Sequence, residues 1–129
     1  MNNFAGTIIE ESLEDKAVLK DLNITSTKVE EVVKEHNTPW LKQWTLHKVD
    51  IPFPKAREIA ERLSRSIVSD HNGSWYADFK NDKYHYVIFK NKVFFIDRTS
   101  QKQYNQAREY GISLGIPEYQ VDFDSNVIK

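Results

Sequence analysis

The sequence predicts an α+β fold, a two-layer sandwich in which an antiparallel sheet of four to five strands carries helices mainly on one face. Three observations predict it. Residues 74–98 alternate aromatic and β-branched side chains around short polar breaks, which is typical of three strands joined by tight turns. An amphipathic helical pattern precedes this stretch, and another follows it. The expected order of elements is α-β-β-α-β-β-β-α.

The length of 129 residues favours a single domain, 1–129, with residues 1–11 and 117–129 either peripheral or flexible. A hydrophobic content of 40% with 29% charged residues is ordinary for a soluble globular protein. No apolar run is long enough to span a membrane, and the first residues lack the pattern of a secretory signal. The absence of cysteine excludes disulfides and thiolate zinc sites and suits a cytoplasmic location.

The first helix is expected to begin at Ser12, with Asp15 in the position of a capping box, and to end at Asn23. The residues before it, 7–9, form either a short strand or the approach to the helix. The apolar stripe of the helix comprises Leu13, Ala17, Val18, Leu19 and Leu22.

Two strands are expected next. Residues 24–33 are rich in β-branched side chains, and an edge position in the sheet would explain their imperfect alternation. Residues 40–51 are expected to be extended as well, although their apolar side chains change sides after Leu46. Either a bulge or a short helical turn around Trp40 and Trp44 would explain that change.

The second helix is expected after Pro54, because proline suits the first turn of a helix. Its apolar residues, spaced by three and four, are Ala56, Ile59, Ala60, Leu63 and Ile67. The third helix is expected to follow Thr99 and to stop at Gly115, since glycine readily adopts the left-handed conformation that ends helices. Its stripe comprises Tyr104, Ala107, Gly111 and Leu114. The tail beyond Pro117 either adds a strand or lies over the core.

The turns of the central meander decide which side chains meet. A first turn at residues 81–82 would place Asp78 directly opposite His85. The larger and more aromatic face should carry the helices and comprises Trp75, Ala77, Phe79, Tyr84, Tyr86, Ile88, Val93, Phe95 and Asp97. The opposite face comprises Tyr76, Asp78, His85, Val87, Phe89, Phe94, Ile96 and Arg98.

The second turn leaves the register open. A turn at residues 91–92 sets Arg98 opposite His85, whereas a turn at residues 90–91 sets Ile96 there and keeps Arg98 on the same face. A three-residue turn would instead place Arg98 on the other face.

The polar end of this second face is the candidate functional site. An aspartate beside a histidine can hold the imidazole by a charge-assisted hydrogen bond and fix its tautomer. We therefore expect His85 and Asp78 to be the catalytic candidates if the protein is an enzyme, with Arg98 and Tyr76 as ligand-binding residues. The competing interpretation, to which we give more weight, is a polar rim of the sheet with a purely structural role.

Other chemistries have less support. The four histidines, His36, His47, His71 and His85, lack the spacing of metal ligands, so no metal and no cofactor is expected. Lysines near the turns lie beside aromatic strand residues, an arrangement that can bind single-stranded nucleic acid. The residues concerned are Lys80, Lys83, Lys90 and Lys92, with Tyr76, Tyr84, Tyr86 and Phe94.

Three segments, HNTPWLKQWTLHKVDI, WYADFKNDKYHYVIF and YGISLGIPEYQVDF, resemble stretches in a family of small stand-alone bacterial proteins of uncharacterised function. The resemblance implies a bacterial, cytoplasmic, single-domain protein. It implies no activity, cofactor or catalytic residue.

The leading functional hypothesis is a binding or interaction module without catalysis, dimeric through the less-covered face of its sheet. One alternative is an enzyme or a protein that binds a small anionic ligand at Asp78, His85 and Arg98. The other alternative is binding of single-stranded nucleic acid through the aromatic sheet.

Overall fold

The computed structural model of the chain describes residues 2–31, 43–68, 75–116, 118–121, 123 and 126–127, with the backbone alone at Gln43 and Tyr119. The strands are β1 (Phe4–Ile9), β2 (Asn23–Glu31), β3 (Gln43–Ile51), β4 (Tyr76–Lys80), β5 (Tyr84–Phe89) and β6 (Lys92–Asp97). The α-helices are α1 (Ala56–Ser66) and α2 (Gln101–Ser113). Short 3-10 turns are η1 (Glu10–Ser12), η2 (Lys16–Asp21), η4 (Phe53–Lys55) and η5 (Glu118–Gln120).

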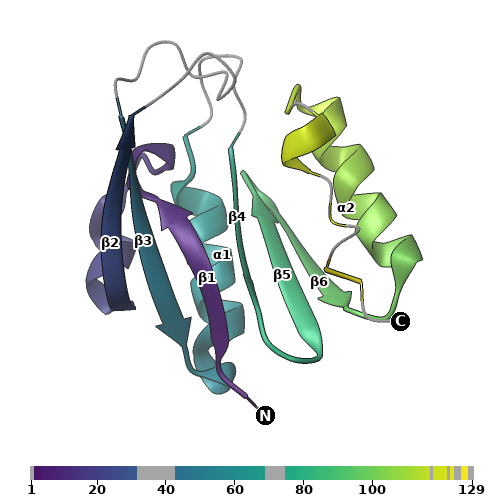
Figure 1. The fold of residues 1–129 in the computed structure, drawn as a ribbon, viewed down its shortest axis with the longest axis horizontal. Coiled ribbons are helices and arrows are strands. Elements are labelled where there is room, and N and C mark those ends of the chain that lie inside the picture. The colour runs from purple at the N-terminus through teal and green to yellow at the C-terminus, as the bar shows by residue number, and fades with distance from the viewer. Residues whose placement is uncertain are drawn as a thin grey trace.

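The strands of the described residues form one six-stranded sheet in the order β2-β3-β1-β4-β5-β6 (Figure 1). Every pairing of neighbouring strands is antiparallel. The α+β class and the antiparallel sheet are therefore confirmed. The sheet has more strands than the four to five expected. The additional strand is β1, whose residues 7–9 were expected to form either a short strand or the approach to a helix.

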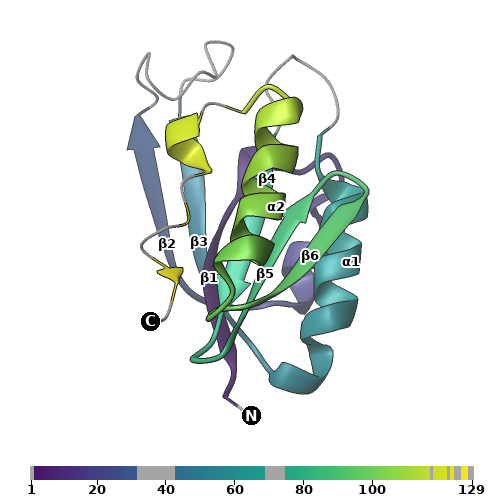
Figure 2. The ribbon, with the colours of Figure 1, turned by 90° about the vertical axis from the view of Figure 1, so that its right-hand side faces the viewer.

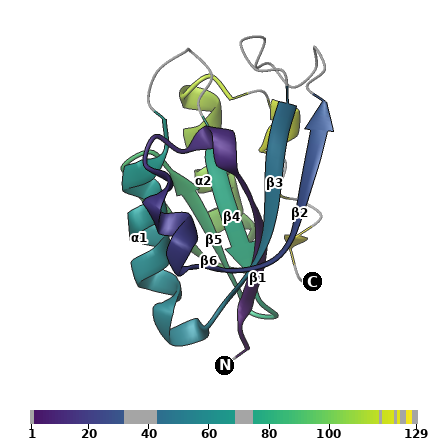
Figure 3. The same cartoon turned by 90° about the vertical axis from the view of Figure 1, so that its left-hand side faces the viewer.

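Helices lie on both faces of the sheet, not mainly on one (Figures 2 and 3). On one face α1 packs on a cluster that includes Phe4, Ile8, Val49, Ile51, Leu63, Phe79, Tyr86 and Ile88. On the other face α2 packs on a cluster of Val87, Phe89, Ile96, Tyr104, Ala107, Ile116, Val121 and Phe123. The two faces of the meander divide as predicted, but the second face has its own helix, so the expected two-layer arrangement is wrong.

The N-terminal segment differs most from the prediction. Strand β1 lies between β3 and β4 near the middle of the sheet, and Phe4 and Ile8 are fully buried, so residues 4–9 are not peripheral. A Cβ added to Gly6 would lie 2.2 Å from the carbonyl oxygen of Asp78 and 2.7 Å from Cβ of Phe79. Glycine is therefore required here by the close approach of β4.

The predicted first helix is replaced by the short turns η1 and η2. Between them Leu13 forms an isolated antiparallel bridge with Ile67. Glu14 N donates to Ser66 O at 2.7 Å, and Val68 N donates to Ser12 O at 2.8 Å. These tertiary bonds hold Leu13 in an extended conformation, so they override the local helical pattern.

Strand β2 is an edge strand, as its imperfect alternation predicted. A bulge between Ile24 and Ser26 explains the irregularity, and Thr25 Oγ1 donates to Lys48 O there at 3.2 Å. Strand β3 pairs with β1 over residues 46–51 without a register shift, so Leu46 and Val49 face opposite sides of the sheet. Trp40 lies outside the described residues.

The two α-helices follow the predicted patterns. Ser100, not Thr99, caps α2, and its side chain accepts a hydrogen bond from Gln103 N at 3.2 Å. Gly115 has a φ of 92°, and Ile116 N reaches back to Gly111 O, as expected for a left-handed helix end. Val121 is fully buried, so this part of the tail lies over the core.

Candidate functional site

The first turn of the meander lies at residues 82–83, one residue beyond the predicted position, and this shifts the pairing of β4 with β5 by two residues. Asn81 N donates to Tyr84 O, and Asn81 Oδ1 accepts bonds from the backbone N–H groups of Lys83 and Tyr84. His85 consequently pairs with Lys80, not with Asp78. A shift of two residues preserves the face of every side chain, so Asp78 becomes a diagonal neighbour of His85 within reach of a hydrogen bond.

The second turn follows the alternative with residues 90–91 at its tip. His85 pairs with Ile96, and Asn91 adopts a φ of 59°, which asparagine tolerates better than most residues. Arg98 therefore lies on the same face as His85 but beyond its direct cross-strand neighbour.

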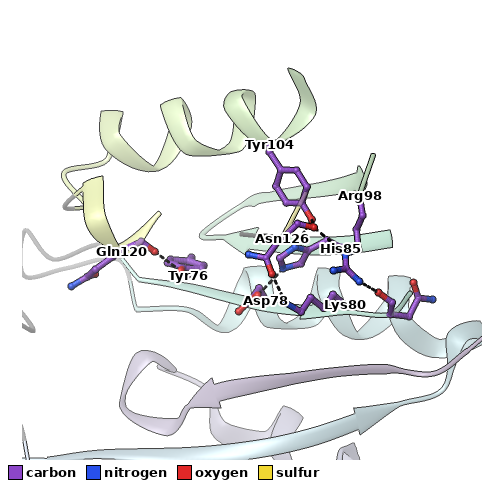
Figure 4. Close-up of polar contacts among 9 residues, drawn as sticks. Tyr76, Asp78, Lys80, His85, Arg98, Tyr104, Gln120 and Asn126 are labelled. Carbon is purple, nitrogen blue, oxygen red and sulfur yellow. Dashed lines mark hydrogen bonds and ion pairs between the residues drawn. The ribbon is translucent and has the colours of Figure 1, made fainter. Parts of the chain in front are cut away.

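His85 is fully buried, and both of its ring nitrogens have hydrogen-bond partners (Figure 4). Its Nε2 lies 2.7 Å from Oδ2 of Asp78, and its Nδ1 lies 3.0 Å from the hydroxyl of Tyr104. The Asp78 side chain is 36% exposed, so it is the end of this chain of contacts that reaches solvent. The imidazole itself offers no surface to a substrate.

These contacts favour one tautomer of His85. A carboxylate can only accept, so the imidazole donates from Nε2 to Asp78. The lone pair of Nδ1 then accepts the hydroxyl proton of Tyr104. Burial raises the pKa of Tyr104, and the nearby Arg98 guanidinium, which hydrogen-bonds to it, opposes that rise. All three side chains thus have hydrogen-bond partners in this arrangement.

Arg98 and Lys80 join this cluster through the C-terminal segment (Figure 4). Arg98 donates from Nε to the carbonyl oxygen of Asn126 at 3.3 Å and from Nη1 to the carbonyl oxygen of Asn81. Lys80 Nζ donates to Oδ1 of Asn126. Both cations are therefore engaged by protein oxygens, and they connect the meander to the end of the chain.

Tyr76 lies apart from His85 on the same face. Its hydroxyl donates to the carbonyl oxygen of Gln120, and its ring packs edge-on against Phe123 at 5.9 Å. Burial raises the pKa of Tyr76 well above the usual value of tyrosine, and the charge of Asp78 adds to the rise. This phenol therefore stays protonated and holds η5 against the sheet.

The structure brings Asp78 and His85 into direct contact and places Arg98 one side chain further away, beyond Tyr104. Tyr104 and Asn126 were not predicted as members of the cluster. Tyr104 did carry a signal, because a tyrosine in a buried helical stripe needs a partner for its hydroxyl. The arrangement fixes one tautomer and ties β4, β5 and α2 together.

A second polar cluster lies on the α1 side, where η1 meets β3 and β2. His47 Nδ1 lies 2.9 Å from Oγ1 of Thr27, and its Nε2 lies 3.1 Å from Oε1 of Glu10. The carboxylate of Glu11 accepts from Thr45 N at 2.6 Å and from Thr45 Oγ1 at 2.8 Å. No local pattern in the sequence indicated this cluster, because it depends on η1 folding back over β3.

A hydroxyl, an imidazole and a carboxylate in line have the order of groups that activates a nucleophile. Thr27, however, lies directly opposite His47 in the strand register, so their contact follows from sheet pairing alone. The cluster's evident role is to hold the edge strand β2 to the body of the protein.

Within the described part of the chain, no three or more histidine, aspartate or glutamate side chains group as ligands of a metal ion. His36 and His71 fall outside that part. None of the helices in the described ranges is long and apolar enough to cross a membrane.

Replacing Tyr104 by phenylalanine should destabilise the protein by about 1–3 kcal/mol, because it leaves the buried Nδ1 of His85 without a donor. Urea unfolding of the variant measures this loss. Tyr110→Phe is the matched control, since Tyr110 packs against the same core cluster from the same helix. Equal stabilities of the two variants would contradict the role given to the Tyr104 hydroxyl.

Acid should weaken the attachment of β2. The hydrogen bond from His47, aided by the charge of Lys16, holds the pKa of Glu10 below its usual value. Its stabilising effect is present above pH about 4.5 and is lost as the pH falls through the lowered pKa. Glu10→Gln should therefore reduce the pH dependence of unfolding between about pH 5 and pH 3, measured with denaturant at fixed ionic strength. If the free energy of unfolding of the variant depended on pH as steeply as that of the wild type, the role given to Glu10 would be contradicted.

Comparison of the chain with protein-family models, with curated proteins and with solved structures finds no match. The resemblance to small bacterial proteins therefore stays a prediction.

Proposed function

We propose that the protein is a non-catalytic interaction module that binds an extended polypeptide segment by strand addition along the outer edge of β2. The observation that carries this proposal is the state of that strand. It is nine residues long, it pairs among the described residues with β3 on one side only, and eight of its residues are exposed. An open edge of this kind presents unpaired backbone donors and acceptors to another chain.

The other edge strand of the sheet is less suited to this role. Strand β6 has six residues, begins with Lys92 and ends with Asp97, and contacts both α1 and α2. Short, charged and helix-flanked edges are ordinary protection against pairing. Strand β2 is longer and contributes no residue to either core cluster, so its sequence is not constrained by packing.

Strand β2 is nevertheless held firmly in place. Its ladder with β3 runs from Asn23 to Glu31, and the contact of Thr27 with His47 attaches it to Glu10. A rigid edge loses little conformational entropy when a partner strand docks on it, which favours binding.

The alternatives have less support. Catalysis at His85 would require the imidazole to meet a substrate, and it is fully buried. A stacking platform for nucleic acid needs exposed rings, but among the aromatic residues of the meander only Phe95 is exposed. A small anion would need free cationic donors, whereas Arg98 and Lys80 bind Asn126.

The sheet face that was expected to be less covered, and that therefore suggested a dimer, is covered over the meander by α2 and by two residues of the C-terminal segment, Val121 and Phe123. This removes the reason for pairing two copies through that face, and it leaves the β2 edge as the better contact surface. The absence of cysteine supports action in a reducing cytoplasm.

A direct test uses an uncharged peptide of about eight alternating threonine and valine residues, which favour extended structure. Added to ¹⁵N-labelled protein, it should shift the amide signals of residues 23–31 and leave those of residues 92–97 in place. A copy of the peptide with N-methyl groups on its backbone is the control, because it lacks the donors that strand pairing needs. Shifts centred on β6, or equal shifts with the methylated peptide, would refute the proposal.

A further inference from the structure

We infer that the segment bound by β2 is the β2 strand of a second copy, paired antiparallel about a two-fold axis that passes through Val29. The inference rests on the proposed function, since it needs the β2 edge to accept a strand. It adds the identity of the partner and the register of the pairing.

The charges of β2 support this register. Lys28 and Glu30 lie on the same side of the strand, where their Nζ and Oε1 atoms are 3.2 Å apart within one chain. Pairing centred on Val29 sets Lys28 of each copy opposite Glu30 of the other, because directly opposed residues are equidistant from the axis. Because of the two-fold symmetry the Lys28–Glu30 contact occurs twice, so four charges of alternating sign lie along the boundary between the two β2 strands.

Neighbouring registers are disfavoured by the same charges. A two-fold axis through Lys28 opposes the two lysines, and an axis through Glu30 opposes the two glutamates. An axis through Thr27 sets Lys28 opposite Ser26 and forms no ion pair. Registers centred between residues would oppose side chains from different faces, which a regular antiparallel pair does not allow.

Apolar contact supports the same register from the other side of the sheet. Val29 pairs with Thr45 and therefore lies on the face opposite Lys28 and Glu30. It is 56% exposed, more than the other exposed large apolar residues, Ile24, Phe95 and Ile112. An axis through Val29 brings the valines of the two copies together and covers both.

The predicted dimer is weak and depends on salt. Among the described residues the pairing spans Thr27 to Glu31 in each copy, a smaller contact than stable dimers use. The Lys28 side chain is 75% exposed, so its attraction to Glu30 is screened by added salt. Association should therefore appear at high concentration and low ionic strength.

Sedimentation velocity from about 10 μM to about 1 mM protein at low salt tests this directly. The wild type should show a reversible monomer–dimer equilibrium. Lys28→Glu sets two glutamates opposite each other at both symmetric positions and should weaken the dimer by about tenfold or more. Glu30→Lys should do the same with lysines.

The double variant Lys28→Glu/Glu30→Lys exchanges the charges and restores complementarity, so it should dimerise within about threefold of the wild type. Lys48→Glu is the matched control: it makes the same change of charge on an exposed residue of β3, away from the edge, and should leave dimerisation intact. A strictly monomeric wild type overturns the inference, and so does a double variant as weak as the single variants.

The threonine–valine peptide separates this inference from the proposed function. The monomeric Lys28→Glu variant should still bind the uncharged peptide at residues 23–31, because backbone pairing does not need the charges. A protein that stays monomeric yet binds the peptide there keeps its strand-addition edge and loses the self-pairing. A protein that does neither loses both.

Discussion

Strand β1 is the constraint on which the rest of the sheet depends. It pairs with β3 over residues 4–9 and with β4 over residues 5–7, so it joins the β2–β3 half of the sheet to the β4–β5–β6 meander. The junction is tight: at Gly6 the backbone of β4 leaves no room for a side chain. Removing β1 would separate the two halves and expose Phe79 and Val49, which pack on either side of it.

The two polar clusters act as attachments around this frame. The contacts of His85 with Asp78 and Tyr104 fix α2 against the meander, while the contacts of His47 with Glu10 and Thr27 fix the edge strand. Each histidine receives a partner on both ring nitrogens, which is the usual requirement for a buried polar group. Both imidazoles are engaged in these contacts, so the open edge of β2 is a better candidate for a functional surface than either polar cluster.

The sequence predicted what depends on local patterns. The stripe of α1, the stop of α2 at Gly115 and the division of the meander into two faces follow from spacing alone. The pairing of segments that are distant in the sequence could not be predicted from local patterns. Gly6 weakens the strand pattern in the sequence, yet β1 needs a glycine there because β4 approaches so closely. The helical pattern after Ser12 does not form a helix, because residues 12–14 bond to residues 66–68 instead. The contact of Asp78 with His85 was predicted from a register two residues away, and it survived because an even shift keeps side chains on their face.

The proposed function requires that β2 is rigid, that its outer edge is open, and that this edge pairs with another strand. Hydrogen exchange of its backbone amides at low and at high protein concentration tests that claim most directly. Outward-facing amides within residues 23–31 should exchange freely in dilute solution and become protected as the concentration rises, while the protection of β5 stays unchanged. Protection that is independent of concentration along β2, or that rises at β6 instead, would contradict the account.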